Sequence, residues 1–108
     1  MYKVRMDRKN KVNTNNSCLQ GHFRMGTSYK ELSKVFGKPA YEETHGNGKT
    51  KCEWVGTIEG DVFTIYDYKQ PVAPEYCQDW HIGGFKEEVA LKLQLHLKEK
   101  QLRRLLNK

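Results

Sequence analysis

The sequence has no long run of apolar residues, and cysteine and proline are scarce. No stretch approaches the roughly 20 apolar residues of a membrane-spanning helix, and no apolar segment follows the basic N-terminus as it would in a signal peptide. The 3 cysteines are an odd number without paired spacing, which favours free thiols in a reducing compartment over a disulfide framework. We therefore expect a soluble protein of the cell interior, without a membrane span.

Aromatic residues are plentiful enough for an ordinary hydrophobic core. The 108-residue chain contains 6 Tyr, 4 Phe and 2 Trp, although its mean hydropathy is −0.85. A chain of this length usually folds as one domain without covalent staples. We expect a single domain over residues 17–108, preceded by a basic flexible arm over residues 1–16; residues 7–17 are polar and show no period.

Positive charge is concentrated at the two ends of the chain. The net charge is +6; residues 1–16 contain five basic residues against one acidic residue, and residues 86–108 contain seven against three. Basic ends favour a polyanionic partner such as nucleic acid, and they serve solubility equally well. The expected phosphate contacts are Lys3, Arg5, Arg8, Lys9, Lys11, Lys98, Lys100, Arg103, Arg104 and Lys108.

A short helix is marked by its boundary residues. Ser28 and Glu31 have the spacing of a capping box, so we expect a helix over residues 29–36. Gly37 supplies a left-handed residue at its end, and Pro39 prevents it from continuing. Residues 18–25 before it alternate as a half-buried strand whose inward side comprises Leu19, Gly21, Phe23 and Met25.

The central region predicts a β-hairpin and a further short strand. Two alternating strands, over residues 51–58 and 62–68, flank a tight turn. The further strand covers residues 79–82, and the glycine pair after it ends the strand. Both tryptophans are expected in one core, whose predicted members are Cys52, Trp54, Ile58, Phe63, Ile65, Trp80 and Ile82.

The last segment predicts a long helix, from about residue 85 to residue 106, that is apolar on two sides. One stripe contains Phe85, Val89, Leu93 and Leu97, with Ala90 beside it; the second contains Leu91, Leu95, Leu102 and Leu106. A helix on one sheet needs only one apolar stripe, so the second favours a homodimer over burial within the fold. The predicted fold is α+β: an antiparallel sheet of about four strands with a short helix and a long C-terminal helix packed on it.

Four segments together resemble a viral protein family. They are Val35-Phe36-Gly37-Lys38-Pro39, Glu53-Trp54-Val55, the strand Val62 to Lys69, and Asp79-Trp80-His81-Ile82-Gly83-Gly84. This pattern is similar to small proteins, mostly of unknown function, that are encoded by tailed bacteriophages and other large DNA viruses. The resemblance covers residues 17–95. It implies a virus-encoded accessory protein that acts inside the host cell, and it implies no particular chemistry.

Two catalytic or metal-binding interpretations are weak. Asp67 and Lys69, with Glu53 on the partner strand, are the residue types of a magnesium-dependent nuclease. In the predicted register, however, Glu53 points to the opposite face from Asp67. A zinc set without paired-ligand spacing can be drawn from Cys52, Cys77, Asp79 and His81. We expect no catalytic residue, no metal and no cofactor.

A ligand site is more plausible around the last strand. The Gly83-Gly84 pair, if it opens the last helix, exposes backbone N–H groups to an anion, although such a turn needs glycine for geometry alone. Alternatively, Tyr66, Tyr68, Trp80 and His81 form an aromatic platform for bases, although aromatic residues of a small sheet are often core. The candidate ligand-binding residues are Tyr66, Tyr68, Lys69, His81, Gly83 and Gly84.

These observations favour a non-enzymatic accessory protein that binds nucleic acid through its basic ends. The alternative is a viral antagonist of host defence that binds a host protein or sequesters a nucleotide, with affinity supplied by the dimer surface. Either protein is expected in the host cell interior, in the cytoplasm or in the nucleus of a eukaryotic host, without a membrane partner.

Overall fold

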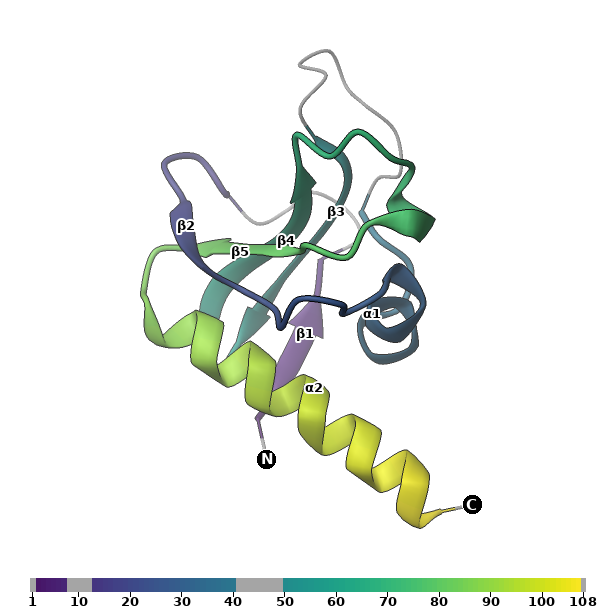
Figure 1. The fold of residues 1–108 in the computed structure, drawn as a ribbon. Coiled ribbons are helices and arrows are strands. Elements are labelled where there is room, and N and C mark those ends of the chain that lie inside the picture. The colour runs from purple at the N-terminus through teal and green to yellow at the C-terminus, as the bar shows by residue number, and fades with distance from the viewer. Residues whose placement is uncertain (1, 8–12, 41–49, 108) are drawn as a thin grey trace.

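The computed structural model describes residues 2–7, 13–40 and 50–107. These residues form a five-stranded antiparallel sheet in the order β1-β3-β4-β5-β2, with two α-helices packed on one of its faces (Figure 1). The predicted α+β class is confirmed. The strands are β1 (Val4–Met6), β2 (Cys18–His22), β3 (Thr50–Ile58), β4 (Asp61–Tyr68) and β5 (His81–Gly84).

Helix α1 (Tyr29–Phe36) has the predicted bounds and the predicted capping box. The Glu31 N–H donates to Ser28 Oγ at 3.1 Å, and the Ser28 N–H donates to Glu31 Oε1 at 3.3 Å. Gly37 ends the helix at a φ of 80°, and its N–H donates to the Ser33 carbonyl at 2.9 Å. Two donors at the first turn are thus satisfied by side chains, which fixes where the helix begins.

The β3–β4 hairpin also follows the prediction. Glu59 and Gly60 form its two-residue turn with φ values of 50° and 83°, as in turns that match the twist of paired strands. The register pairs Trp54 with Ile65 and Gly56 with Phe63, so the predicted core side chains share the face that the helices cover. The predicted strand parity is therefore correct.

The two tryptophans form the centre of the core. Trp54 and Trp80 are both fully buried, and their rings meet edge to face with centroids 5.4 Å apart. Each indole N–H has a backbone acceptor, because Trp54 donates to the Gly37 carbonyl at 2.8 Å and Trp80 to the Cys77 carbonyl at 3.2 Å. The prediction that both are buried in one core is confirmed.

The first residues of the chain correct one prediction. Strand β1 pairs with β3 as the edge of the sheet, and Val4 and Met6 pack against the core. The expected flexible arm is therefore wrong for residues 4–6, whose alternation is too short to recognise in the sequence. Three of the predicted basic contacts in this arm, Arg8, Lys9 and Lys11, lie outside the described residues.

Strand β2 is shorter than predicted and changes phase within its length. It ends at His22, and a bulge between Leu19 and Gly21 interrupts its pairing with β5. Leu19 and Met25, predicted to face inward, are exposed, whereas Phe23 is buried. Gly21 lies against α2, where a Cβ would come within 2.9 Å of the Ala90 Cβ. The bulge is what a strict alternation cannot anticipate.

The Gly83-Gly84 pair lies within β5 and not at its end. Gly83 pairs with Thr64 and Leu19, and Gly84 pairs with Phe63 and Cys18. Both glycines are buried, so the predicted exposed anion site at the start of a helix is wrong. A Cβ on Gly83 would lie 2.6 Å from Thr64 Oγ1, so close packing across the sheet accounts for glycine there.

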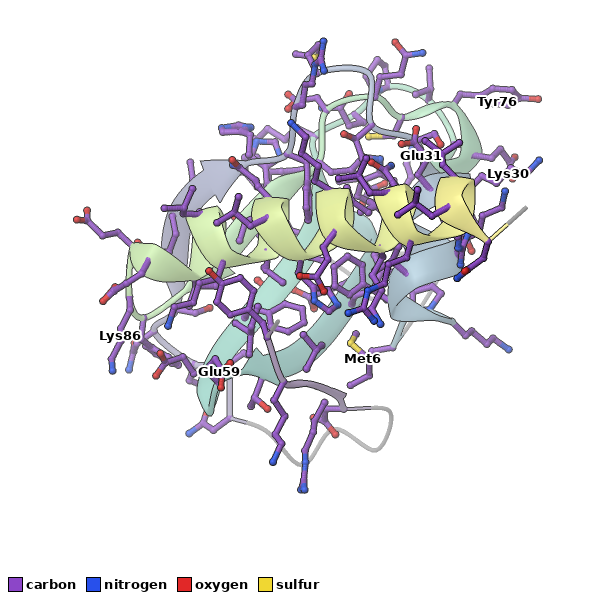
Figure 2. The ribbon with its side chains drawn as sticks, turned by 90° about the horizontal axis from the view of Figure 1, so that it is seen from below. Met6, Lys30, Glu31, Glu59, Tyr76 and Lys86 are labelled. Atoms are coloured by element: carbon purple, nitrogen blue, oxygen red, sulfur yellow. The ribbon has the colours of Figure 1, made fainter. Side chains whose placement is uncertain are left out.

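Helix α2 (Glu88–Leu106) crosses the covered face of the sheet, and its C-terminal half lies beside Lys30 and Glu31 of α1 (Figure 2). Val89, Leu93 and Leu97 are buried, as predicted, but Phe85 precedes the helix and is half exposed. The second stripe is exposed throughout, from 45% for Leu95 to 83% for Leu106. In the part of the chain that is described, neither helix has the length and apolarity of a membrane crossing.

Candidate functional site

Three aromatic rings stand side by side on the outer face of the sheet, which is the face opposite the helices. Tyr66 of β4 and His22 of β2 are both register partners of His81 on β5, which lies between them. The Tyr66 and His81 rings are stacked, with centroids 5.4 Å apart and an interplanar angle of 18°. The His22 ring lies 4.4 Å from that of His81, at 49°. We call these three residues the ring column.

Tyr68 and Lys69 extend the ring column at the β4 end. The Tyr68 ring meets Tyr66 and His81 edge-on, with centroid distances of 6.3 Å and 5.8 Å. Lys69 adopts a φ of 53°, and its ammonium lies 5.4 Å from the centre of the Tyr68 ring. Four of the six predicted ligand-binding residues are therefore neighbours, whereas the glycine pair contributes only close packing.

Trp80 was the fourth expected member of an aromatic platform, and it is not part of the ring column. Successive side chains of a strand point to opposite faces, and Trp80 precedes His81 by one residue. Trp80 is accordingly fully buried beneath the sheet, in contact with Trp54 and Tyr29. The aromatic platform therefore divides between the two faces of the sheet.

The carboxylate of Asp79 lies beside the ring column, in contact with His22. Its Oδ1 lies 3.1 Å from Nδ1 of His22, and both side chains are partly exposed. The potential ligand atoms of His22, Asp79 and His81 all lie within 4.8 Å of one another. Sequence reasoning considered the last two residues but missed His22, because the long-range pairing of β2 with β5 is what brings it there.

The zinc set with two cysteines, considered from the sequence and found weak, is not assembled among the described residues. Cys52 and Cys77 are buried, and both belong to the hydrophobic core. Burial raises the pKa of the Cys77 thiol, and the charges of Asp67 and Asp79 act in the same direction, so the thiol is favoured over the thiolate that binds metals. Among the described residues, the side chains that could bind a metal and that do lie together are the two imidazoles of His22 and His81 and the carboxylate of Asp79.

The rings of Tyr66 and His81 are electrically neutral near pH 7. Burial lowers the pKa of His81, and the neighbouring His22 lowers it further. Burial raises the pKa of Tyr66, and the charge of Glu53, its partner on β3, adds to the effect. A neutral imidazole stacked on a neutral phenol is an aromatic surface without formal charge at its centre.

Asp67, which was considered as a magnesium ligand of a nuclease, instead holds the backbone of β3. It is fully buried, and its Oδ1 accepts the N–H groups of Lys51 and Cys52 at 2.9 Å and 3.0 Å. These bonds satisfy the backbone at the irregularity between Thr50 and Glu53. Glu53 instead pairs with Tyr66 on the outer face, so the carboxylate pair of a two-carboxylate magnesium site is not assembled.

The described basic residues come from two parts of the chain. Lys3 and Arg5 are exposed at β1, the edge strand at the opposite side of the sheet from β2. Arg104 donates to the Lys34 carbonyl at 2.6 Å, which places the end of α2 beside α1. Lys98, Lys100 and Arg103 share that helix, and Lys108 lies outside the described residues. Lys3 and Arg5 thus lie at the edge of the sheet that is farthest from His22 in the strand order.

A groove of 680 Å³ runs between α2 and the segment that joins β2 to α1. Its lining includes Met25, Leu91 and Leu95, together with His22 and Lys98. Gln94 links α2 to β2 along this groove, because its side-chain amide donates to the His22 carbonyl at 2.6 Å. The groove therefore connects half of the exposed leucine stripe with the β2 end of the ring column.

Comparisons of the chain with protein-family models, with curated proteins and with solved structures gave no match. The functional interpretation therefore depends on the chemistry of the outer face.

Proposed function

We propose that this protein binds single-stranded nucleic acid without catalysing a reaction, and that the ring column stacks the bases. The observation that carries the proposal is the alignment of three rings across three neighbouring strands of one sheet face. Some single-strand binding domains stack unpaired bases on aromatic side chains of one face of a sheet. Duplex bases are already stacked on one another, so single strands are the better fit.

The two ends of the aromatic cluster are accessible to a base. The side chain of His22 is 45% exposed and Tyr68 is 37% exposed, while Tyr66 and His81 between them are more covered. Each stacked base contributes about 1–3 kcal/mol to binding. Lys69 beside Tyr68 supplies a positive charge for the adjoining phosphate.

The basic ends have a weaker role in this proposal than the sequence indicated. Lys3 and Arg5 lie at the opposite edge of the sheet from His22, and of the predicted α2 contacts Lys98 lines the groove that reaches His22. These cations mainly attract a polyanion at long range and contribute little to base contacts. Binding should therefore weaken with salt yet keep a component that depends on the rings. This combination distinguishes the outer face from a purely electrostatic surface.

The test is fluorescence anisotropy with a labelled oligothymidine of about 12 nucleotides, in the range of known single-strand sites. Tyr68→Ala should weaken binding about 5- to 150-fold, which corresponds to the loss of one stacked base. Tyr76→Ala is the matched control, because Tyr76 is also exposed but belongs to the 3₁₀ helix η1 (Pro74–Tyr76) and not to the strands of the ring column. Equal affinities of the two variants, or no binding by the unmodified chain at low salt, would refute the proposal. EDTA in the buffer excludes any contribution from metal ions.

The exposed leucines of α2 favour a second candidate. Leu91, Leu95, Leu102 and Leu106 give α2 an apolar outer stripe, and two of them line the groove. We propose that this stripe joins two copies of the chain as a homodimer or, in an antagonist of host defence, holds a host protein. Viral origin and action inside a host cell are supported by the sequence resemblance alone and stay predictions.

A further inference from the structure

We propose that His22, Asp79 and His81 bind a divalent transition-metal ion of the zinc class. Their potential ligand atoms already lie within 4.8 Å of one another, although the residues come from β2, from β5 and from the segment before β5. Two imidazole nitrogens and one carboxylate oxygen are ligands that zinc accepts and that magnesium and calcium rarely share. No other group of three His, Cys, Asp or Glu side chains within the described ranges has this spacing.

The distances require little rearrangement for coordination. Two ligand atoms of a tetrahedral zinc ion, each about 2.1 Å from the metal, lie about 3.4 Å apart. His22 Nδ1 and Asp79 Oδ1 are 3.1 Å apart, so this pair already has the spacing of two ligands of one ion. The distances from these two atoms to the ligand atom of His81 are at most 4.8 Å, so they have to shorten by up to about 1.4 Å, which small changes in side-chain torsion angles provide.

The backbone holds the two histidines opposite each other. His22 and His81 are register partners on antiparallel strands, and the next residue, Phe23, donates its N–H to the Trp80 carbonyl at 2.9 Å. The bulge of β2 precedes His22 and sets the phase that turns its ring to the outer face. The strands therefore fix the separation of the two rings before any ion arrives, which lowers the entropic cost of binding.

A second observation points to a missing ligand at His81. Its Nδ1 is buried and has no hydrogen-bond partner among the described residues. Buried polar atoms without a partner are uncommon and costly in folded proteins. Coordination of a metal ion by Nδ1 would supply the partner that this nitrogen lacks among the described residues.

Three protein ligands leave at least one position of the ion open. Water or an anionic oxygen of a ligand can occupy that position, beside the stacked rings. The inference does not depend on nucleic-acid binding, because the ligand set consists of this chain's own side chains. Should both proposals hold, the ion would contact a phosphate while Tyr68 stacks the base.

The experiment is a titration of the full chain, without nucleic acid, with Zn²⁺ by calorimetry and with Co²⁺ by absorption spectroscopy. We expect one ion per chain and the visible absorption of a Co²⁺ ion with nitrogen and oxygen ligands. His22→Ala, Asp79→Asn and His81→Ala should each lower the affinity for zinc by about tenfold or more. Cys18→Ser is the matched control for an exposed thiol on the same strand, and Tyr76→Ala is the control for an exposed aromatic residue outside the site; both should bind zinc normally.

A measurement on the unmodified chain keeps the test independent of folding of the variants. The ring ¹⁵N resonances of His22 and His81 should shift on addition of Zn²⁺, while those of the buried His96 should not. No saturable binding of zinc would overturn the inference. Binding that Cys18→Ser abolishes, or that leaves the His22 and His81 resonances unchanged, would overturn it as well, by assigning the ion to other residues.

Discussion

Replacing Trp54 by alanine removes one of the largest buried side chains of the protein. The ring contacts Trp80 and Tyr29, with centroid distances of 5.4 Å and 5.6 Å, and its N–H bonds to the end of α1 at Gly37. Truncations of buried tryptophans cost about 3–5 kcal/mol in the free energy of unfolding. The free energy of unfolding of a domain of this size is about 5–15 kcal/mol in total. We therefore expect the variant to be only marginally stable.

The assay is unfolding in urea, followed by far-UV circular dichroism because the substitution removes a fluorophore. We expect the midpoint for Trp54→Ala to fall by more than about 1 M without a change in slope. Trp54→Phe keeps a ring but loses the hydrogen bond to the Gly37 carbonyl, so its urea midpoint should lie between those of the unmodified protein and Trp54→Ala. The exposed Tyr76→Ala should stay within about 0.5 kcal/mol of the unmodified protein. A cost below about 1 kcal/mol for Trp54→Ala would show that the ring is not packed as described.

Three further predictions concern α2 and the buried polar groups. Leu95→Lys with Leu102→Lys should convert a dimer into a monomer in sedimentation with the circular dichroism unchanged, and a monomeric unmodified chain at high concentration would contradict the homodimer. Asp67→Ala should cost about 2–3 kcal/mol in urea unfolding, since two backbone N–H groups lose their acceptor; an unchanged midpoint would refute the structural role. Burial lowers the pKa of His96, so the neutral ring is the folded form, and its contribution to stability is complete above pH 6.5 and is lost as the pH falls below it. The melting temperature should accordingly drop between about pH 7 and pH 5, and less steeply in His96→Leu; parallel pH profiles would exclude His96 as a source of the dependence.

Deleting residues 1–16 is a poor test of the basic N-terminus. The deletion removes β1 together with the charges, because Val4–Met6 pair with Ile58–Gly56 of β3. A loss of nucleic-acid affinity would then have two explanations. Substituting Lys3 and Arg5 by glutamine removes the charge and keeps the edge strand, since both side chains are exposed.

The elements that the sequence predicts correctly are those whose signals are local. The capping box and Gly37 define α1 within a few residues, and the hairpin turn lies directly between the two strands that it joins. Burial of Trp54 and Trp80 follows from strand parity, which needs only a period of two. Each of these features is determined by residues that are close together in the chain.

The features that the sequence does not reveal depend on partners far along the chain. His22 acquires its role because β2 pairs with β5, more than fifty residues later, and only after a bulge has changed its phase. The glycine pair is explained by Thr64 and by the β4 backbone, which a local pattern cannot identify. Most of the candidate site can therefore be listed by residue type from sequence, but its geometry cannot.

The origin of the two edge strands has a consequence for the order of folding during synthesis. Strands β1 and β2 come early in the chain, yet they form the two opposite edges of the sheet: β1 pairs with β3 of the later hairpin, and β2 pairs with β5, which follows the hairpin. Cys18 cannot meet Gly84 until the ribosome has translated most of the chain. Strand β2 therefore lacks its partner until β5 has been synthesised, and we expect the addition of this edge strand to be a late step of folding.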